Sequence, residues 1–285
     1  MALCDVVAAV RAGDHERVTA RPLAGGMNHS VFAVTLPDGT PACCKLFRTG
    51  DGADKREWTA LCLLRDANAG FAPLPLYYEP GAVLMSLVEG DGLGHTKLDA
   101  AQVATLADQL DRLYRIPLPT SLPPGNGLAA GVDNVRRRHR DATSDDPALA
   151  AAGRWLATTE PDELKQLDTA VFGRGDPNLA NCLWNTPALT FIDWEDGGPT
   201  NRAFELGDLV EHVQSRATPD ATWDTLLTAF DLTRAERRHL ALARRLMSIS
   251  WLLLLQPGQP GFAVNPPETR RGQAERVLAL LDGPP

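Results

Sequence analysis

The spacing of apolar residues changes once along this chain of 285 residues, at the glycine-rich segment 89–94 (EGDGLG). Before this segment, short apolar runs alternate with turn residues, which is typical of strands. After it, apolar residues recur at intervals of three and four, which indicates helices. We therefore predict an α+β fold of two lobes: a small β-rich lobe at residues 1–88 and a larger, mainly helical lobe at residues 89–285.

The first lobe is predicted to contain a β-hairpin, because residues 31–36 (VFAVTL) and 41–47 (PACCKLF) are apolar and residues 37–40 (PDGT) form a turn sequence. A helix over residues 51–64 follows, where apolar side chains recur at helical spacing. A short buried strand is expected at 81–87 (GAVLMSL). Otherwise the first 85 residues are expected to be mainly strands and turns.

The second lobe is predicted to be built from helices, with two strand-like runs at 169–172 and 189–192. The longest apolar run, 246–255, is about half the length that a bilayer requires, roughly 20 residues. It is therefore expected to be a buried core helix, and no membrane partner is predicted. The expected helices are 98–113, 129–139, 147–155, 161–167, 204–214, 221–230, 233–255 and 267–281.

Charge and cysteine content argue against several classes of protein. The chain has 28 Lys and Arg against 36 Asp and Glu, a net charge of −8, which disfavours nucleic-acid binding. The one basic block, residues 136–140 (RRRHR), is interpreted as a solvated helix face. Five cysteines without a C-x-x-C pair predict neither disulfides nor a zinc site. Together with an N-terminus that lacks a basic leader, they favour a cytoplasmic protein. The sequence makes no prediction of oligomeric state.

Several catalytic motifs are absent from the sequence. It contains no G-x-x-x-x-G-K-[ST], which excludes a P-loop fold. It also contains no H-E-x-x-H and no G-x-S-x-G, which argues against the common zinc proteases and serine hydrolases.

Polar residues follow the strand-like runs between residues 171 and 209. Asp176 lies in a loop with Gly175, Asn181 follows five residues later, and Asp193 ends an apolar strand within a predicted hairpin. Two carboxylates and an amide oxygen are hard ligands that suit Mg²⁺. A carboxylate that does not bind the metal could accept a hydroxyl proton.

The pattern G-D-x-x-x-x-N followed by I-D-W-E resembles the aminoglycoside phosphotransferase and choline kinase-like family of small-molecule kinases. The resemblance implies the bilobed protein-kinase fold. The first lobe agrees in order: a loop at 23–30 (LAGGMNHS), Lys45 in an apolar strand, Glu57 on the next helix, and a hinge segment at 85–90 (MSLVEG). The resemblance covers about residues 20–210.

In such a kinase Asp176 would orient the acceptor hydroxyl and take its proton, while Asn181 and Asp193 would bind Mg²⁺. Lys45 would hold the α- and β-phosphates of ATP, and Glu57 would be its ion-pair partner. The remaining nucleotide contacts implied are backbone groups near the phosphates and the adenine, at Gly25, Gly26, Ser30, Ser86 and Val88.

The chain departs from the resembling family at one position. The family usually has His two residues before the catalytic Asp, where this chain has Arg174. The sequence leaves open whether Arg174 pairs with Asp193, pairs with Glu195 or contacts phosphate. Arg174 is also the one feature that favours the alternative function, a non-catalytic pseudokinase-like module that binds a nucleotide or small ligand.

Acidic residues gather after the strand that ends at Asp193, and they predict a cationic hydroxyl acceptor, such as an aminoglycoside or an amino alcohol. Asp208 is interpreted either as support for the catalytic loop or as part of an acidic helix face. Trp184 and Trp194 are expected to be packing residues, and His29 and His212 to be structural. The acidic residues are Glu195, Asp196, Glu205, Asp208 and Glu211.

Overall fold

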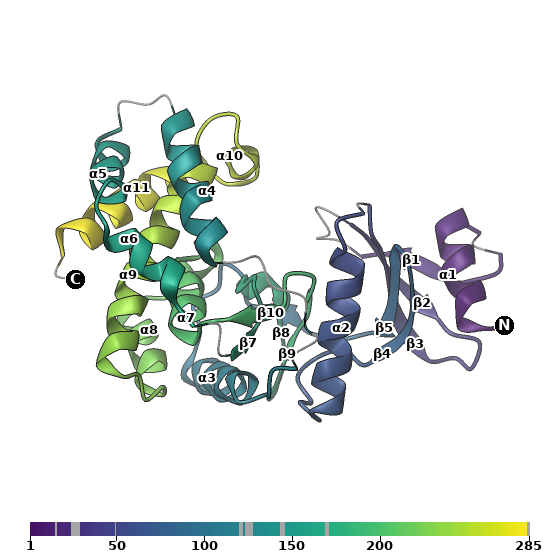
Figure 1. Ribbon diagram of the computed structural model, residues 1–285. Coiled ribbons are helices and arrows are strands. Elements are labelled where there is room, and N and C mark those ends of the chain that lie inside the picture. Colours follow the sequence, from purple (N-terminus) through teal and green to yellow (C-terminus); the bar gives the residue numbers. More distant parts are fainter. Residues whose placement is uncertain are drawn as a thin grey trace.

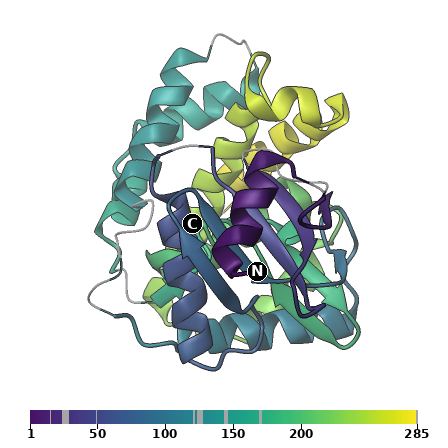
Figure 2. The same ribbon diagram turned by 90° about the vertical axis from the view of Figure 1, so that its right-hand side faces the viewer.

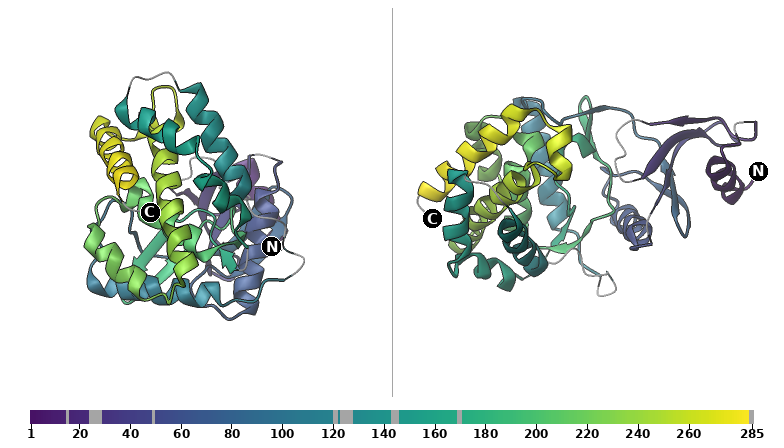
Figure 3. Two further views of the ribbon diagram at one scale, coloured as in Figure 1. Left: turned by 60° about the vertical axis from the view of Figure 1, so that its left-hand side comes forward. Right: turned by 90° about the horizontal axis from the view of Figure 1, so that it is seen from above.

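The computed structural model describes residues 1–14, 16–23, 29–48, 50–119, 122, 128–142, 146–168 and 171–283, without the side chains of residues 128–130. Gly25 and Gly26, the predicted phosphate-loop glycines, lie outside the described residues. The structure has a sheet with two helices at one end and a larger group of helices at the other (Figure 1). Seen from above, the two parts lie side by side, as in a bilobed α+β fold (Figure 3).

The N-terminal part is an antiparallel sheet of five strands in the order β1-β2-β3-β5-β4. Helix α1 (Leu3–Ala12) covers its outer face, and α2 (Ala53–Asp66) lies on the face toward the other helices (Figures 1 and 2). The strands are β1 (Ala20–Pro22), β2 (Ser30–Thr35), β3 (Pro41–Leu46), β4 (Pro75–Glu79) and β5 (Ala82–Ser86).

The alternation of side chains along β3 decides which of them point toward α1 and which toward α2. Ala42 and Cys44 are buried with Val6 and Val10 of α1. Because successive side chains of a strand point to opposite faces, Lys45 points to the other face, toward α2. That face also receives Glu57, which is on the buried side of α2 with Leu61 and Leu64.

The predicted hairpin is confirmed, and its turn is closed by the side chain of Asp38, which accepts the N–H of Thr40 at 2.9 Å. Two segments of this part differ from expectation. Residues 3–12 form α1, where mainly strands and turns were expected, because Val6, Val7 and Val10 recur on one face and pack on the sheet. The proline-containing segment before β5 contributes the edge strand β4.

The C-terminal part contains nine α-helices within the described ranges and two small antiparallel sheets. One sheet pairs β7 (Val171–Gly173) with β10 (Gly198–Thr200), and the other has the order β6-β8-β9. Its strands are β6 (Asp91–Gly92), β8 (Cys182–Asn185) and β9 (Ala188–Phe191). The helices are α3 (Ala100–Tyr114), α4 (Leu128–Asp141), α5 (Pro147–Leu156), α6 (Glu160–Glu163), α7 (Arg202–Glu211), α8 (Asp220–Thr228), α9 (Arg234–Leu254), α10 (Pro260–Val264) and α11 (Pro267–Asp282).

These bounds agree with most of the predicted helices, but α10 was not expected, and α6 ends at Glu163, followed by a 3₁₀ turn (Leu164–Gln166), where a helix to residue 167 was expected. Helix α7 begins at Arg202, because the side chain of Asn201 accepts the N–H of Ala203, and it ends at Glu211 rather than at 214. In the basic block, Arg136 binds Asp162 at 2.7 Å and the carbonyl of Leu156, so this arginine is not part of a purely solvated face. Among the described helices, none has the length and apolar character that crossing a membrane requires.

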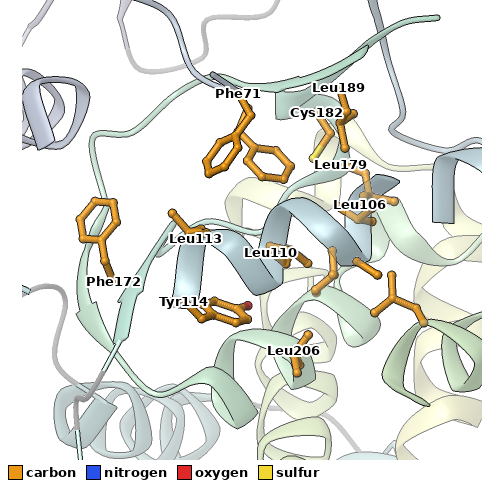
Figure 4. Close-up of a cluster of buried hydrophobic side chains, with 14 of the residues drawn as sticks. Phe71, Leu106, Leu110, Leu113, Tyr114, Phe172, Leu179, Cys182, Leu189 and Leu206 are labelled. Carbon is orange, nitrogen blue, oxygen red and sulfur yellow. The ribbon is translucent and has the colours of Figure 1, made fainter. Parts of the chain in front are cut away.

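Two apolar cores hold the C-terminal part together. The first runs from α3 through β9 to α7 and continues into α2 and β5, so it joins both parts of the molecule. Figure 4 shows Leu106, Leu110 and Leu113 along α3, with Leu106 beside Leu179 at one end of the helix and Phe172 beyond the other end. The second core joins α4, α5, α9 and α11. The loops after β7 and β9 leave the first core, which therefore fixes where their polar residues lie.

Candidate active site

A Cβ would collide with neighbouring atoms at the last residue of β7, Gly173, and at Gly175 in the loop that follows. Gly175 has φ +70°, and a Cβ there would lie 2.1 Å from the backbone oxygen of Asp196. A Cβ at Gly173 would lie 2.2 Å from the side chain of Thr200. These glycines let the chain turn tightly just before Asp176, whose Oδ1 accepts the N–H of Asn178 at 3.1 Å.

Glu205 on α7 anchors this loop. Its carboxylate accepts the N–H of Arg174 at 3.0 Å and the N–H of Gly175 at 3.2 Å. Burial raises the pKa of Glu205, and the two backbone N–H groups oppose that rise. The sequence placed Glu205 only among acidic residues near the acceptor. Its contacts instead show it supporting the loop, the role considered for Asp208.

The structure brings together the three residues that the sequence singled out. Asn181, in a 3₁₀ turn (Leu179–Asn181), donates from Nδ2 to Oδ2 of Asp176 at 3.1 Å and to Oδ2 of Asp193 at 3.5 Å. Asp193 follows β9 with φ +64°, a left-handed conformation that is uncommon for a residue other than glycine. The strained backbone turns its carboxylate toward Asn181 and Lys45.

Lys45 connects the sheet to this loop. Its Nζ lies 2.6 Å from Oε2 of Glu57, 2.5 Å from Oδ1 of Asp193 and 2.8 Å from Oε2 of Glu195. Burial alone would lower the pKa of Lys45, but these three carboxylates raise it above its ordinary value, so the ammonium stays charged. One oxygen from each of the three carboxylates lies within 4.8 Å of the others, a spacing that could hold a metal ion. In this structure the ammonium of Lys45 contacts all three carboxylates.

A second contact between the two parts was missed by the sequence analysis, which treated His29 as structural. His29 Nε2 lies 3.0 Å from Oε2 of Glu195, and its Nδ1 accepts the N–H of Arg48. Arg56 on α2 donates from Nε to the carbonyl of Glu195 at 2.7 Å. Glu195 is therefore held by the N-terminal part at its carboxylate and at its backbone.

Arg174 is buried, with 1% of its surface exposed. Its guanidinium lies over the ring of Phe191, 4.8 Å from the centroid, and donates to Sγ of Cys182 at 3.3 Å. Among the described residues, its side-chain partners thus include neither Asp193 nor Glu195. Burial raises the pKa of Asp176, and the Arg174 charge opposes that shift.

Two other acidic candidates, Glu211 and Asp208, are surrounded by protein groups rather than by solvent. Glu211 is fully buried and pairs with Arg216, Arg244 and Arg276, at 3.3, 2.8 and 2.8 Å, so its partners lie on α9, α11 and the segment after α7. Burial, together with the charges of Glu205 and Asp176, raises the pKa of Asp208 well above its ordinary value. The carboxylates of Glu205, Asp208 and Glu211 therefore do not form an open acidic surface, whereas Asp196 is half-buried.

The candidate nucleotide contacts lie on the strands of the sheet. Ser30 begins β2, next to the undescribed residues 24–28. Ser86 ends β5, where its N–H donates to the carbonyl of Leu74 at 2.9 Å and its hydroxyl accepts the N–H of Leu74. That backbone donor is already used within the sheet, whereas Val88 lies beyond the strand in the connection to β6.

The residues present fit a magnesium ion. Asn181 uses its Nδ2 toward two carboxylates, so its amide oxygen is the atom left for a cation. Together with the Asp193 carboxylate it gives two hard oxygen ligands, the number with which Mg²⁺ usually binds a protein beside phosphates. The site thus combines a carboxylate that could act as a base, two oxygen groups that could bind a metal, and a buried cation.

A model of the phosphotransferase enzyme family matches residues 19–246 of the chain. No curated protein matches the sequence. Three solved structures share the fold at 14 to 19% identity. A choline/ethanolamine kinase family protein from Mesorhizobium loti has a TM-score of 0.71 at 19% identity and covers 100% of this chain and 96% of its own.

The second structure is a putative fructosamine-3-kinase from Thermobifida fusca, with a TM-score of 0.62 at 17% identity, covering 93% of this chain and 94% of its own. The third is a thermostable mutant of the aminoglycoside phosphotransferase APH(4)-Ia, in ternary complex with AMP-PNP and hygromycin B. Its TM-score is 0.66 at 14% identity, covering 96% of this chain and 98% of its own.

Proposed function

Because the chain belongs to the phosphotransferase enzyme family, we propose that it transfers the γ-phosphoryl group of ATP to a hydroxyl group of a small molecule. One observation carries the proposal: Asp176, Asn181, Asp193 and Lys45 form a continuous set of contacts of 2.5 to 3.5 Å across the two parts of the molecule. A base, two metal ligands and a phosphate-binding cation are the components that phosphoryl transfer needs.

Each residue has a role that follows from its contacts. Asp176, held by Asn178 and Asn181, orients the acceptor hydroxyl and takes its proton. Lys45 exchanges its contacts with Asp193 and Glu195 for the non-transferred phosphates, while Glu57 keeps its ammonium aimed. Ser30 and Val88 supply backbone contacts to the phosphates and the adenine.

Asn181 and Asp193 would hold the magnesium ion, which supplies positive charge to the phosphate oxygens when bound. The chain contributes fixed geometry. Glu205 holds the loop backbone and the strained Asp193 holds its carboxylate in place before any ligand arrives. Because these groups are in position before the ligands bind, the protein does not have to reorganise them during the reaction.

For the acceptor we propose a molecule that carries an amine, in the cytoplasm, where ATP is available. The solved structures with the same fold include a choline/ethanolamine kinase family protein and an aminoglycoside phosphotransferase in complex with hygromycin B, and choline, ethanolamine and aminoglycosides all carry a cationic nitrogen. The acidic cluster gives weaker support, because Glu195, Glu205 and Glu211 have partners within the protein. The five cysteines are free thiols, in keeping with a reducing compartment.

ADP release from Mg·ATP tests this function with choline, ethanolamine, aminoglycosides and neutral sugars as acceptors. We expect acceptor-dependent turnover with at least one amine, and its loss in Asp176→Asn while Mg·ATP binding is retained. Asp168→Asn, the same change at an exposed position, is the matched control and keeps full activity. Tight Mg·ATP binding by the wild type without turnover on any acceptor would instead support the pseudokinase-like binding module.

A further inference from the structure

His212 directly follows α7, at its C-terminal cap, and two contacts hold its ring in place. It is 4% exposed, and its ring packs edge-on against Trp251 of α9, with centroids 4.3 Å apart and an interplanar angle of 75°. Its Nδ1 accepts the backbone N–H of Gln214 at 3.1 Å. The sequence analysis treated this histidine as structural. These contacts involve the ring face and Nδ1, and they give no hydrogen-bond partner to the other ring nitrogen, Nε2.

The contacts determine where the imidazole carries its proton. A nitrogen that accepts a backbone N–H cannot itself be protonated, so the proton of the neutral ring is on Nε2. Burial, and then the charges of Arg174, Arg216 and His95, lower the pKa of His212 to about 3. The ring is therefore a neutral hydrogen-bond donor with a single N–H, fixed in direction by Gln214 and Trp251.

This N–H faces the catalytic loop. Nε2 lies 3.9 Å from Oδ1 of Asp176, which is longer than an N–H···O hydrogen bond. Oδ2 accepts from Asn181 and Oδ1 accepts the N–H of Asn178, and a carboxylate oxygen has a second lone pair for one more donor. Nε2 makes no hydrogen bond of ordinary length within the described residues, and an oxygen atom placed beside the 3.9 Å line from Nε2 to Oδ1 is at hydrogen-bond distance from both.

Resting on the proposed kinase function, we propose that His212 is a further catalytic residue, whose Nε2–H donates a hydrogen bond to the acceptor's hydroxyl oxygen while that hydroxyl donates to Oδ1 of Asp176. The two contacts orient the oxygen so that a remaining lone pair faces the γ-phosphorus. As the new O–P bond forms, the bond from the γ-phosphorus to the bridging oxygen breaks and ADP leaves. The hydroxyl proton passes to Asp176, and His212 keeps its own proton throughout.

The test compares His212→Phe, which keeps a ring against Trp251 but has no donor, with His212→Gln, which restores an N–H. With an acceptor found as described above, we expect His212→Phe to lower kcat/KM for the acceptor about tenfold, the effect of one lost hydrogen bond. The KM for Mg·ATP stays unchanged, and His212→Gln recovers part of the loss. His239→Phe, the same change on α9 three turns before Trp251, is the control and keeps wild-type kinetics.

A second readout needs no turnover. Nitrogen-15 NMR of the imidazole in the full-length protein is expected to show the Nε2–H tautomer, with resonances that move in Asp176→Ala. An Nδ1–H tautomer, or a His212→Phe enzyme with wild-type kcat/KM for the acceptor, overturns the proposal while leaving the kinase function in place. Absence of any transfer by the wild type overturns the kinase function, and with it this role.

Discussion

Glu205 Oε2 accepts the backbone N–H of Arg174 at 3.0 Å, so a residue of α7 holds the chain two residues before Asp176. The contact depends on Gly173, where a Cβ would lie 2.6 Å from the Glu205 carboxyl carbon. Helix α7 in turn packs closely on α9 at Gly207, where a Cβ would lie 2.7 Å from that of Ala243. The catalytic loop is thus fixed through α7 to the longest helix of the core.

We expect Glu205→Gln to lower both stability and turnover. The amide offers one oxygen, so one of the two N–H groups, at Arg174 or Gly175, faces an NH₂ group instead of an acceptor. A buried donor left unsatisfied costs about 1–3 kcal/mol, and kcat falls because Asp176 is no longer held in position. Urea denaturation and acceptor kinetics measure the two effects. Glu163→Gln, which breaks an exposed pair with Arg238, should change neither by a comparable amount.

Gly175→Ala tests the tight turn. A left-handed backbone costs about 1–2 kcal/mol for an ordinary residue, and the added methyl would collide with the carbonyl oxygen of Asp196. We expect a loss of stability together with a fall in kcat. Gly131→Ala in α4 should instead stabilise the protein by up to about 1 kcal/mol, because nothing lies within 4 Å of its Cβ position. Equal effects of the two substitutions would refute the argument.

Much of the site could be predicted because its residues follow local patterns. Asp176, Asn181 and Asp193 lie within 18 positions of one another in sequence, in loops next to apolar strands, so their spacing is informative. Lys45 could be singled out because a lysine within an apolar strand matches the phosphate-binding lysine of the resembling family. The helix expected at 98–113 is found at Ala100–Tyr114, since Val103, Leu106 and Leu110 lie on one apolar face over several turns, which is a strong signal.

What could not be predicted depends on contacts between distant segments. Glu205 and His29 look ordinary in the sequence, and their roles arise only when α7 meets the loop and β2 meets Glu195. The partners of the acidic residues could not be predicted for the same reason, because sequence alone does not show that three arginines surround Glu211. Helix α1 was missed because its apolar run is short.

Lys45 should be needed both for stability and for nucleotide binding, and a double substitution separates the two. Lys45→Met leaves Glu57, which is 1% exposed, without its counter-ion, a change that costs about 3–5 kcal/mol in buried pairs. We expect the additional change Glu57→Gln to restore stability but not the affinity for Mg·ATP, measured by calorimetry. Lys165→Met, at a surface pair with Asp133, is the control. Wild-type affinity in the double variant would show that Lys45 does not contact phosphate.

We expect Arg174 to determine the pH below which kcat falls. Burial raises the pKa of Asp176 and the Arg174 charge lowers it, so Arg174→Met raises it further. Asp176 must be ionised to take a proton, and activity is lost as pH falls through its pKa. The variant should therefore lose kcat at a higher pH than the wild type and approach wild-type kcat in alkaline buffer. Arg154→Met, the same change at an exposed position, serves as the control. If kcat of Arg174→Met falls at the same acidic pH as that of the wild type, this electrostatic role of Arg174 is ruled out.

Glu236 should make stability depend on pH at the junction of α7 and α9. It accepts hydrogen bonds from Arg202 and from the N–H of Thr233, the residue that caps α9. The bond from Arg202, opposed by burial and aided by Thr233, lowers the pKa of Glu236 to about 2. A lowered pKa in the folded state stabilises the protein fully above the ordinary value of 4.5, and this contribution is lost as pH falls toward 2.

Glu236→Gln lacks this contribution at every pH. We expect the wild type to exceed it by about 1 kcal/mol in free energy of unfolding at pH 7, a modest value because water screens the pair. The difference should narrow progressively between pH 4.5 and pH 2 in urea denaturation. Glu275→Gln, at an exposed position on α11, should show a small difference that does not change with pH. A wild-type advantage over Glu236→Gln that stays constant down to pH 2 would mean that the Arg202 pair does not act through the charge of Glu236.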